Sequence, residues 1–292
     1  MKYNDDVGVR YGNNISRGSY VAKTLKYIVC ILLAIISILP FWIMFMNATR
    51  GTYEIQQNAI SLLPSTHLLS NMKVLHGKSF NPVRGFINSL IVSTGVTACT
   101  VYFSLLTAYA LVVYDWRMRQ PFFTFIMAVM LIPAQVSGIG FYQFMYKLNW
   151  TNSFLPLILP AIAAPAAVFF MRQYLLGALP LDIVDSARID GAGEFHIFNR
   201  IVLPIAKPAM ATQAIFSFVG SWNNLFTPLI LLTKQDKYTM PIMVSLLRGD
   251  IYKTEYGSVY LGLSLTVLPL FIIYFVLSKY IIQGVALGSV KG

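Results

Sequence analysis

Six long stretches of this 292-residue chain contain no Asp, Glu, Lys or Arg. Each has between 23 and 30 residues, and about 20 mostly apolar residues suffice for a helix to cross a bilayer. A single segment in lipid pairs all its own backbone polar groups only as a helix. The stretches are Tyr27–Thr49, Gly85–Tyr114, Gln120–Tyr146, Leu148–Met171, Pro208–Thr233 and Tyr256–Ser278.

The composition supports the same interpretation. Hydrophobic residues make up 57% of the chain and charged residues 11%, whereas soluble domains contain about 25% charged residues. So few ionisable groups could not cover a soluble protein of this size, and the apolar content excludes a disordered chain. We therefore expect an all-α, polytopic membrane protein with six transmembrane helices.

The charge pattern divides the chain into three expected parts. These are a cytoplasmic N-terminal tail (1–26), a six-helix transmembrane domain (27–283) and a cytoplasmic C-terminal tail (284–292). Within the domain, residues 172–207 form the longest inner loop and residues 234–257 an outer loop. Prolines within or near the spans predict broken helices, which membranes tolerate beside protein or water: Pro133, Pro156, Pro160, Pro165, Pro228 and Pro269.

The basic residues favour one orientation. With six spans both tails share a side, and that side would hold 13 of the 22 Lys and Arg residues against 9 on the other. Since Lys and Arg are enriched in cytoplasmic loops, both termini are predicted to be cytoplasmic. The net charge of +11 is interpreted as orientation and attraction to anionic headgroups, and no nucleic-acid partner is expected.

Residues 180–208 form a polar connection between the fourth and fifth apolar stretches. Inserting the six charges before Pro204 would cost roughly 15 kcal/mol, at about 2.5–3.5 kcal/mol for each charge at the bilayer centre. The connection therefore lies in water or against another protein. These six charged residues are Asp182, Asp185, Arg188, Asp190, Glu194 and Arg200, and Lys207 follows near its end.

Two short helices with a glycine break are predicted in this connection. Pro180 can open the first helix, and Gly191 with Gly193 ends it. Asp190 is placed to cap the second helix.

The second helix would present Phe195, Phe198 and Val202 on one face and would close at Pro204. Such a rigid, partly apolar unit can enter a cleft in a soluble partner.

The same residues resemble a known family. Asp185-Ser-Ala-Arg-Ile-Asp-Gly-Ala192, Phe195 and Ile201-Val-Leu-Pro204 look like the EAA loop of ABC importer permeases, with Asp185 in place of Glu and Ser186 in place of the first Ala. The stretch from Asn88-Ser-Leu90 through Thr107-Ala-Tyr-Ala-Leu111 is similar to the second span of maltose-type carbohydrate permeases. Ser221–Leu229 and Gly284–Gly292 are similar to the same permeases and point to the smaller subunit of a heterodimeric sugar importer.

This resemblance implies the type I permease fold of ABC importers and a set of partners. They are a second, different permease subunit forming a heterodimer, two ATPase subunits, and an extracytoplasmic sugar-binding protein that delivers a sugar or oligosaccharide. The chain would be a non-enzymatic transport subunit in a bacterial or archaeal cell membrane. It would bind no cofactor itself, because ATP and Mg belong to the ATPases.

The inner loop is expected to act as the ATPase-coupling element. Asp185 and Arg188 would contact charged groups of the ATPase, and Gly191 would set the elbow. Phe195 and Phe198 either enter the ATPase cleft or pack back under the spans. The full set is Asp185, Ala187, Arg188, Asp190, Gly191, Ala192, Phe195, Phe198, Leu203 and Pro204.

Three further groups follow from residue chemistry and the resemblance. Aromatic rings and amides that suit a sugar pathway are Gln135, Tyr142, Gln143, Trp222, Asn223 and Asn224, although Asn also links helices in lipid. The outer loop would contact the binding protein through Arg248, Asp250, Tyr252, Glu255 and Tyr256. The C-terminal tail would reach between the ATPases through Gly288, Ser289, Val290 and Lys291.

Alternative functions are weighed against this one. An ion-coupled secondary transporter normally carries ionisable groups in its spans, and these stretches have none. A membrane enzyme needs a convergent catalytic set, and no nucleophile–base pair is visible; the three histidines also lack metal-ligand spacing. A permease of the same fold for a non-sugar solute is opposed by the resemblance alone.

Overall fold

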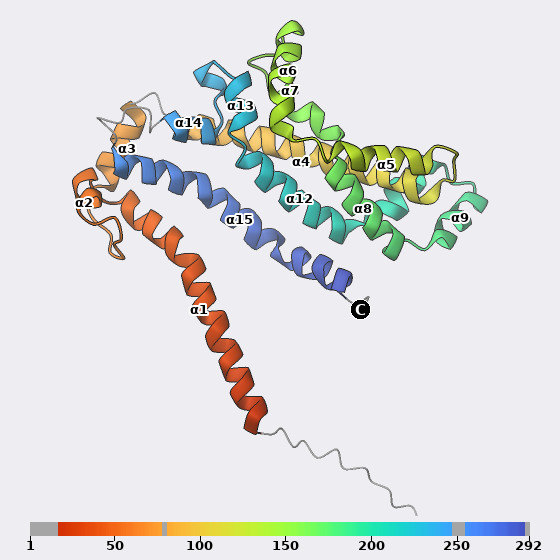
Figure 1. The fold of residues 1–292 in the computed structure, drawn as a ribbon, viewed down its shortest axis with the longest axis horizontal. Helices are drawn as coiled ribbons and strands as arrows, with labels where there is room; N and C mark the ends of the chain where they lie inside the picture. The colour runs from red at the N-terminus through yellow and green to blue at the C-terminus, as the bar shows by residue number, and fades with distance from the viewer. Residues whose placement is uncertain (1–16, 78–80, 247–254, 290–292) are drawn as a thin grey trace, which may run out of the picture.

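The computed structural model describes residues 17–77, 81–246 and 255–289, and all regular structure within these ranges is helical (Figure 1). The α-helices are α1 (Arg17–Ala48), α2 (Thr52–Gln57), α3 (Leu68–Gly77), α4 (Pro82–Val113), α5 (Arg119–Val129), α6 (Ala134–Lys147), α7 (Leu155–Ile158), α8 (Pro165–Ala178), α9 (Leu181–Ile189), α10 (Glu194–Ile197), α11 (Leu203–Ile205), α12 (Lys207–Trp222), α13 (Phe226–Leu231), α14 (Met240–Leu246) and α15 (Tyr256–Ser289). Short 3-10 turns η1 (Leu159–Ile162) and η3 (Gln235–Lys237) and a π-helical turn η2 (Phe198–Val202) complete the order.

Uninterrupted helices do not reproduce the expected count of six spans. Among the described residues, three segments are long and apolar enough to cross a membrane: Lys23–Ala48, Pro82–Val113 and Leu155–Ala178. The number of candidate spans rises to four if the helical segments Glu194–Ile205 and Lys207–Trp222, which meet at a bend of 80°, are counted together as one broken span.

Helix breaks explain two of the three expected spans that are missing from this count, and the third, in α15, contributes only the shorter apolar helix Tyr256–Ile272. The expected third span consists of α5 and α6, with 11 and 14 residues, separated at Pro133. The fifth consists of α12, with 16 residues, followed by a break and the short α13. Broken helices were predicted from the prolines, but charge-free length alone does not show where a span is interrupted.

Helix α4 is the central element, and it packs against α8 and α12. Leu105 and Ala108 of α4 meet Met171 and Leu175 of α8 in a fully buried core that also includes Phe198. A second core joins the end of α1 to α3, α14 and α15. The two cores hold the opposite ends of α4 in fixed surroundings.

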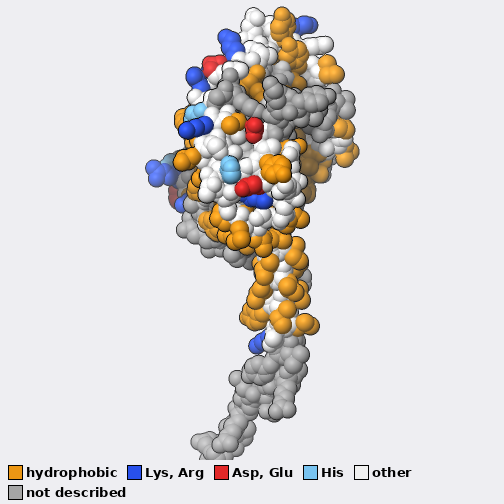
Figure 2. Space-filling model, turned by 90° about the vertical axis from the view of Figure 1, so that its left-hand side faces the viewer, with side chains coloured by type: hydrophobic (Ala, Val, Ile, Leu, Met, Phe, Trp, Pro, Cys, Tyr) orange, Lys and Arg blue, Asp and Glu red, His pale blue; other side chains and the backbone are white. Residues whose placement is uncertain are grey.

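Helix α1 projects from the rest of the molecule. Phe41 and Phe45, near its C-terminal end, contact Phe271 of α15 with ring centroids 5.3 and 6.5 Å apart. The remainder extends away from the bundle with apolar side chains on its surface (Figure 2). Within this single chain α1 therefore has apolar surface that only lipid or another subunit would cover.

Helices run across three of the boundaries that the charge pattern predicts. Helix α1 begins at Arg17 inside the expected tail of residues 1–26, and α15 continues to Ser289 inside the expected tail of residues 284–292. Residues 172–178 of the expected inner loop belong to α8. Helical hydrogen bonding continues past the last apolar residue, whereas the boundaries were set by hydropathy.

The outer loop of residues 234–257 is not simply a solvated connection. It contains α14, whose Met240, Ile242 and Met243 are buried. The Ser89 hydroxyl of α4 accepts a hydrogen bond from the backbone N–H of Met240 at 2.8 Å. The described part of this loop is therefore packed into the second core.

Gly257 should tolerate no side chain. A Cβ there would lie 2.3 Å from the Arg50 carbonyl oxygen and 2.5 Å from the Asn71 amide nitrogen. Gly257→Ala should destabilise the protein by about 1–3 kcal/mol, measured as a lower thermal unfolding midpoint in detergent. Gly140→Ala is the control because a Cβ at Gly140 meets nothing within 4 Å. Equal midpoints for both variants would contradict this packing.

Candidate functional site

The inner segment, residues 179–206, connects α8 to α12 and reverses direction at Gly191. Gly191 has φ of +79°, its N–H donates to the Arg188 carbonyl, and the Ala192 N–H donates to the Ala187 carbonyl at 2.9 Å. This pair of bonds is the Schellman ending of a helix, which favours glycine at the left-handed position. The predicted glycine elbow is confirmed.

Two local predictions in this segment are wrong. Asp190 is the C-cap residue of α9 and does not cap the second helix. Gly193 is the N-cap residue of α10, because the reversal at Gly191 separates Asp190 from that helix. Pro204 does not close that helix. The chain continues through η2 and α11 to Ala206, where it bends into α12.

The two phenylalanines of the segment take different places. Phe198 is fully buried, with its ring 5.5 Å from that of Tyr102 and 5.6 Å from that of Tyr109, both on α4. Phe195 is 70% exposed. Phe198 therefore packs back under α4, while Phe195 remains free to meet a partner.

Arg188 is the centre of an ion-pair network that ties the segment together. Its Nε donates to Oε1 of Glu194 at 2.7 Å, and its Nη1 donates to Asp185 at 3.1 Å. The Tyr109 hydroxyl donates to Oε2 of Glu194 at 2.7 Å, and the guanidinium lies over the ring of Tyr114. The network joins α9 and α10 to the end of α4.

This network changes the interpretation of the charged residues. The sequence predicts no role for Glu194, because it lies six residues from Arg188 across a glycine break, and that spacing does not indicate that the two side chains are neighbours. Arg188 is occupied within the chain, whereas the Asp185 side chain is 64% exposed. Asp185 therefore remains open to a partner's cation.

Hydrogen bonds from Arg188, and then from the hydroxyls of Tyr114 and Tyr109, lower the pKa of Glu194 to about 2 from its ordinary 4.5. The same carboxylate raises the pKa of Arg188 above its usual range. Both groups are thus charged at any physiological pH.

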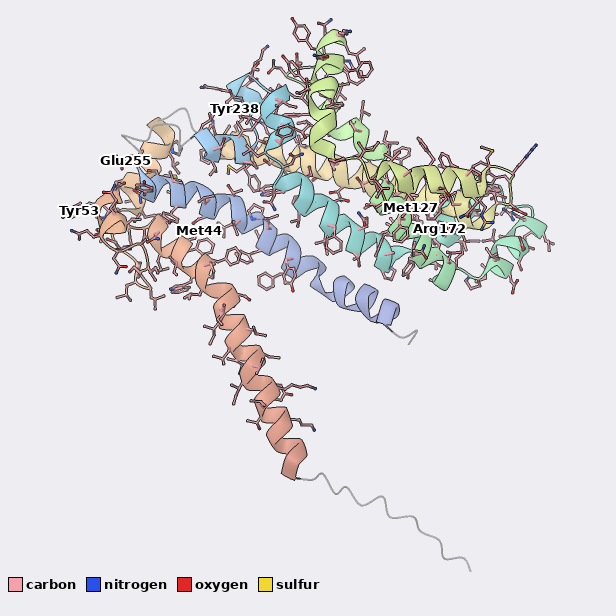
Figure 3. All side chains as sticks on the ribbon, viewed as in Figure 1. Met44, Tyr53, Met127, Arg172, Tyr238 and Glu255 are labelled. Atoms are coloured by element: carbon pink, nitrogen blue, oxygen red, sulfur yellow. The ribbon has the colours of Figure 1, made fainter. Side chains whose placement is uncertain are left out.

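The remaining residues of the coupling set lie around this network. Ala187, Ala192 and Leu203 are partly buried against the core that contains Phe198. Asp190, Gly191 and Pro204 are exposed. Helix α9 stands at the far end of the molecule from α2 and α3, beside the labelled Arg172 region (Figures 1 and 3).

A cavity of about 710 Å³ lies between α4, α8, α12 and the α6–α13 pair. Four polar residues of α12 and its C-terminal end line it at near-helical spacing: Gln213, Ser217, Ser221 and Asn224. Val92, Phe141 and Phe216 are among its apolar walls, and none of the described residues that line it is charged. The cavity thus combines neutral hydrogen-bonding groups with apolar and aromatic surface.

The predicted pathway residues are only partly brought together there. Asn224 lines the cavity, and Tyr142 lines a smaller adjoining pocket. Trp222 is buried instead; it stacks with Phe218 and donates to the Thr266 carbonyl at 2.9 Å. Because successive helical residues point about 100° apart, Ser221 faces the cavity and Trp222 faces α15.

The other three predicted pathway residues are amides, and they have separate outcomes. Asn223 and Gln143 are exposed and are not among the lining residues. Gln135 lies at the start of α6, where side-chain positions are not described. Sequence reasoning missed Gln213, Ser217 and Ser221, although their spacing of four residues was a usable signal.

Most residues predicted to contact the binding protein, or to reach the ATPases from the C-terminal tail, are not described by the structure. Arg248, Asp250, Tyr252, Val290 and Lys291 lie outside the described residues. Glu255 accepts a hydrogen bond from the Thr52 hydroxyl at 2.7 Å, and Tyr256 is exposed at the start of α15. Gly288 and Ser289 belong to the last turn of α15.

Because of this network, the free energy of unfolding should depend on pH in the acid range. Glu194→Gln should destabilise the protein by about 0.5–1 kcal/mol at pH 7, the range for partly exposed ion pairs. Since folding depresses this pKa, the stabilisation is complete above pH 4.5 and is lost as the pH falls toward 2. The thermal midpoints of wild type and variant should therefore differ at pH 7 and converge near pH 2. A constant difference would contradict the ion pair, and Asp190→Asn, an exposed carboxylate, serves as control.

Comparisons with known proteins agree with this architecture. Residues 100–287 match the family model described as "Binding-protein-dependent transport system inner membrane component". The chain is 36% identical to the arabinooligosaccharides transport system permease protein AraQ of Halalkalibacterium halodurans, over 89% of this chain and 93% of that protein. It is 30% identical to the sn-glycerol-3-phosphate transport system permease protein UgpE of Escherichia coli, over 84% and 89%.

A solved structure supports the fold. A chain of the crystal structure of a bacterial ABC transporter involved in the import of the acidic polysaccharide alginate superposes with a TM-score of 0.75 at 22% identity, covering 91% of this chain and 98% of that one. The family comprises transport components rather than enzymes. This chain belongs to the family of inner membrane components of binding-protein-dependent transport systems.

Proposed function

We propose that this chain is one permease subunit of an ATP-driven importer for a neutral sugar or oligosaccharide. The observation that carries the substrate class is the cavity, which offers hydroxyl and amide groups beside apolar walls and no charged side chain. Sugars combine hydroxyl groups with apolar ring faces, so neutral polar and apolar surface suits them. The similarity to AraQ supports a saccharide.

A non-sugar solute is the second candidate, because UgpE is also similar to this chain. A phosphorylated solute carries negative charge, which an apolar cavity disfavours unless a cation or several hydrogen-bond donors compensate it. The lining contains no Lys or Arg among the residues that the structure describes. The neutral solute is therefore the better match to the part of the pathway that this chain supplies.

The inner segment would couple ATP binding to movement of the spans. In this proposal, α9 and the exposed Phe195 dock into an ATPase subunit, and Asp185 meets a cationic group there. Phe198 and the Glu194–Tyr109 hydrogen bond would pass the displacement to α4. The spans would then switch between inward-open and outward-open arrangements by rigid-body movement.

The remaining parts of the proposal concern the assembly. Six spans would be formed by the six charge-free stretches, with helix breaks allowed beside the cavity, and both termini would be cytoplasmic. A second, different permease would complete the pathway, and two ATPases would bind ATP and Mg. The outer loop would contact an extracytoplasmic binding protein, and the C-terminal tail would reach the ATPases.

Gly191 gives a direct test of coupling. Gly191→Val forces a β-branched residue to φ of +79°, which should disrupt the elbow and reduce uptake at least about tenfold while the subunit still inserts. Asp185→Lys should have the same effect by reversing the docking charge. Gly193→Val is the matched control, since Gly193 has φ of −69° and open space around it. Retained uptake in both test variants would refute the coupling role.

The function itself is tested by uptake in cells that lack this chain. Deletion should abolish uptake of a labelled arabino-oligosaccharide and spare sn-glycerol-3-phosphate. Loss of sn-glycerol-3-phosphate uptake alone would favour the second candidate. Unchanged uptake of both solutes would contradict both candidates.

A cavity-filling variant links this function to the site. Gly220→Phe, which points bulk into the cavity, should fail to restore uptake, whereas Gly140→Phe, outside the lining, should restore it.

A further inference from the structure

The loop between α2 and α3, residues 58–67, turns back alongside α1. Trp42 Nε1 donates a hydrogen bond to the Leu62 carbonyl at 3.1 Å. Trp42 precedes the end of α1 at Ala48 by six residues, about 9 Å along the helix at 1.5 Å per residue. Figure 1 shows the loop hanging beside the upper part of α1. The loop therefore lies next to a candidate membrane span rather than beyond its end.

Residues 59–64 of this loop present a mostly apolar, uncharged surface. Ile60, Leu62 and Leu63 are 70%, 55% and 74% exposed. The sequence has no Asp, Glu, Lys or Arg between Glu54 and Lys73. Figure 2 shows apolar side chains on α1 and on the part of the head directly adjoining it. The exposed loop residues thus extend the apolar surface of α1.

Side chains of the protein pair the backbone of the loop. The Asn58 side chain accepts from the Ile60 N–H at 3.1 Å. The Ser61 hydroxyl accepts from the Leu63 N–H and donates to the Leu63 carbonyl, both at 3.3 Å. Trp42 pairs the Leu62 carbonyl. In water such pairing is unnecessary, but near hydrocarbon each unpaired backbone group is costly.

A polar cluster at the end of α1 holds the loop in place. Arg50 is buried, and its Nη1 donates to the Asn58 carbonyl at 2.7 Å and to the Asn47 side chain at 3.0 Å. Asn47 Nδ2 in turn donates to the Ala59 carbonyl at 2.9 Å. The apolar residues are therefore presented on a fixed backbone.

We infer that this loop is a membrane-interface anchor, in which Ile60, Leu62 and Leu63 insert into the headgroup–acyl boundary of the leaflet opposite the inner segment. The occupant is lipid, because the surface continues that of a span and side chains already pair several of the loop's backbone groups. Membrane location follows from the family, so this inference does not depend on the transported solute. Its physical effect would be to fix the height of the outer end of α1 in the bilayer.

Spin-label accessibility in the assembled transporter, reconstituted in lipid nanodiscs, tests the inference. Leu63→Cys is labelled in a chain whose two cysteines, Cys30 and Cys99, are replaced by Ser. The label at Leu63 should collide more with oxygen, which concentrates in lipid, than with a water-soluble nickel chelate. Gln57→Cys, an exposed polar position at the end of α2, is the control and should show the reverse order.

Each alternative result overturns the inference. Preferential nickel collision at Leu63 would place the loop in water. Low collision with both reagents would mean that another protein subunit covers it. Ile60→Cys gives a second reading if the first variant fails to assemble. Uptake measured with the same cysteine variants in sealed vesicles keeps this result separate from failure of the proposed function.

Discussion

Backbone N–H and C=O groups need partners wherever water is excluded, and this requirement shapes the whole molecule. Helix α4, with 32 residues, meets it without interruption and serves as the frame. Elsewhere the helices break, and side chains pair the backbone nearby. Asn152 Oδ1, for example, accepts from the N–H groups of Thr233 and Lys234 at 2.7 and 2.9 Å after α13 ends. Broken helices are thus compatible with a membrane protein that surrounds a cavity.

The inner segment behaves as one body with the end of α4. Phe198 fixes it by close packing, and the Arg188–Glu194–Tyr109 network fixes it by charge-assisted hydrogen bonds. Close-packed interiors deform little, so a force on the exposed surface of α9 would be passed to α4 rather than absorbed. The same arrangement leaves Asp185 and Phe195 exposed, which separates the residues that hold the segment from those that can meet a partner.

The cavity shows what a single helix contributes to a lining. Gln213, Ser217 and Ser221 repeat every four residues and therefore share one face of α12, while Trp222 lies on another face and packs against Phe218 and α15. An aromatic residue in a span is thus a weak indicator of a sugar site. Polar residues at helical spacing are a better one, because polar groups directed at lipid are disfavoured.

The sequence by itself determined the helical class, the polar inner segment and its elbow, because charge-free length, charge content and glycine act locally. Tertiary structure alone decided which of the prolines interrupt a helix, which phenylalanine turns inward, and that Glu194 pairs with Arg188. Those outcomes depend on contacts between residues far apart in the chain, such as Tyr109 with Glu194, and no local pattern encodes them. The same reason explains why Trp222 was assigned to the pathway although it is buried: the direction of a side chain depends on the helices around it.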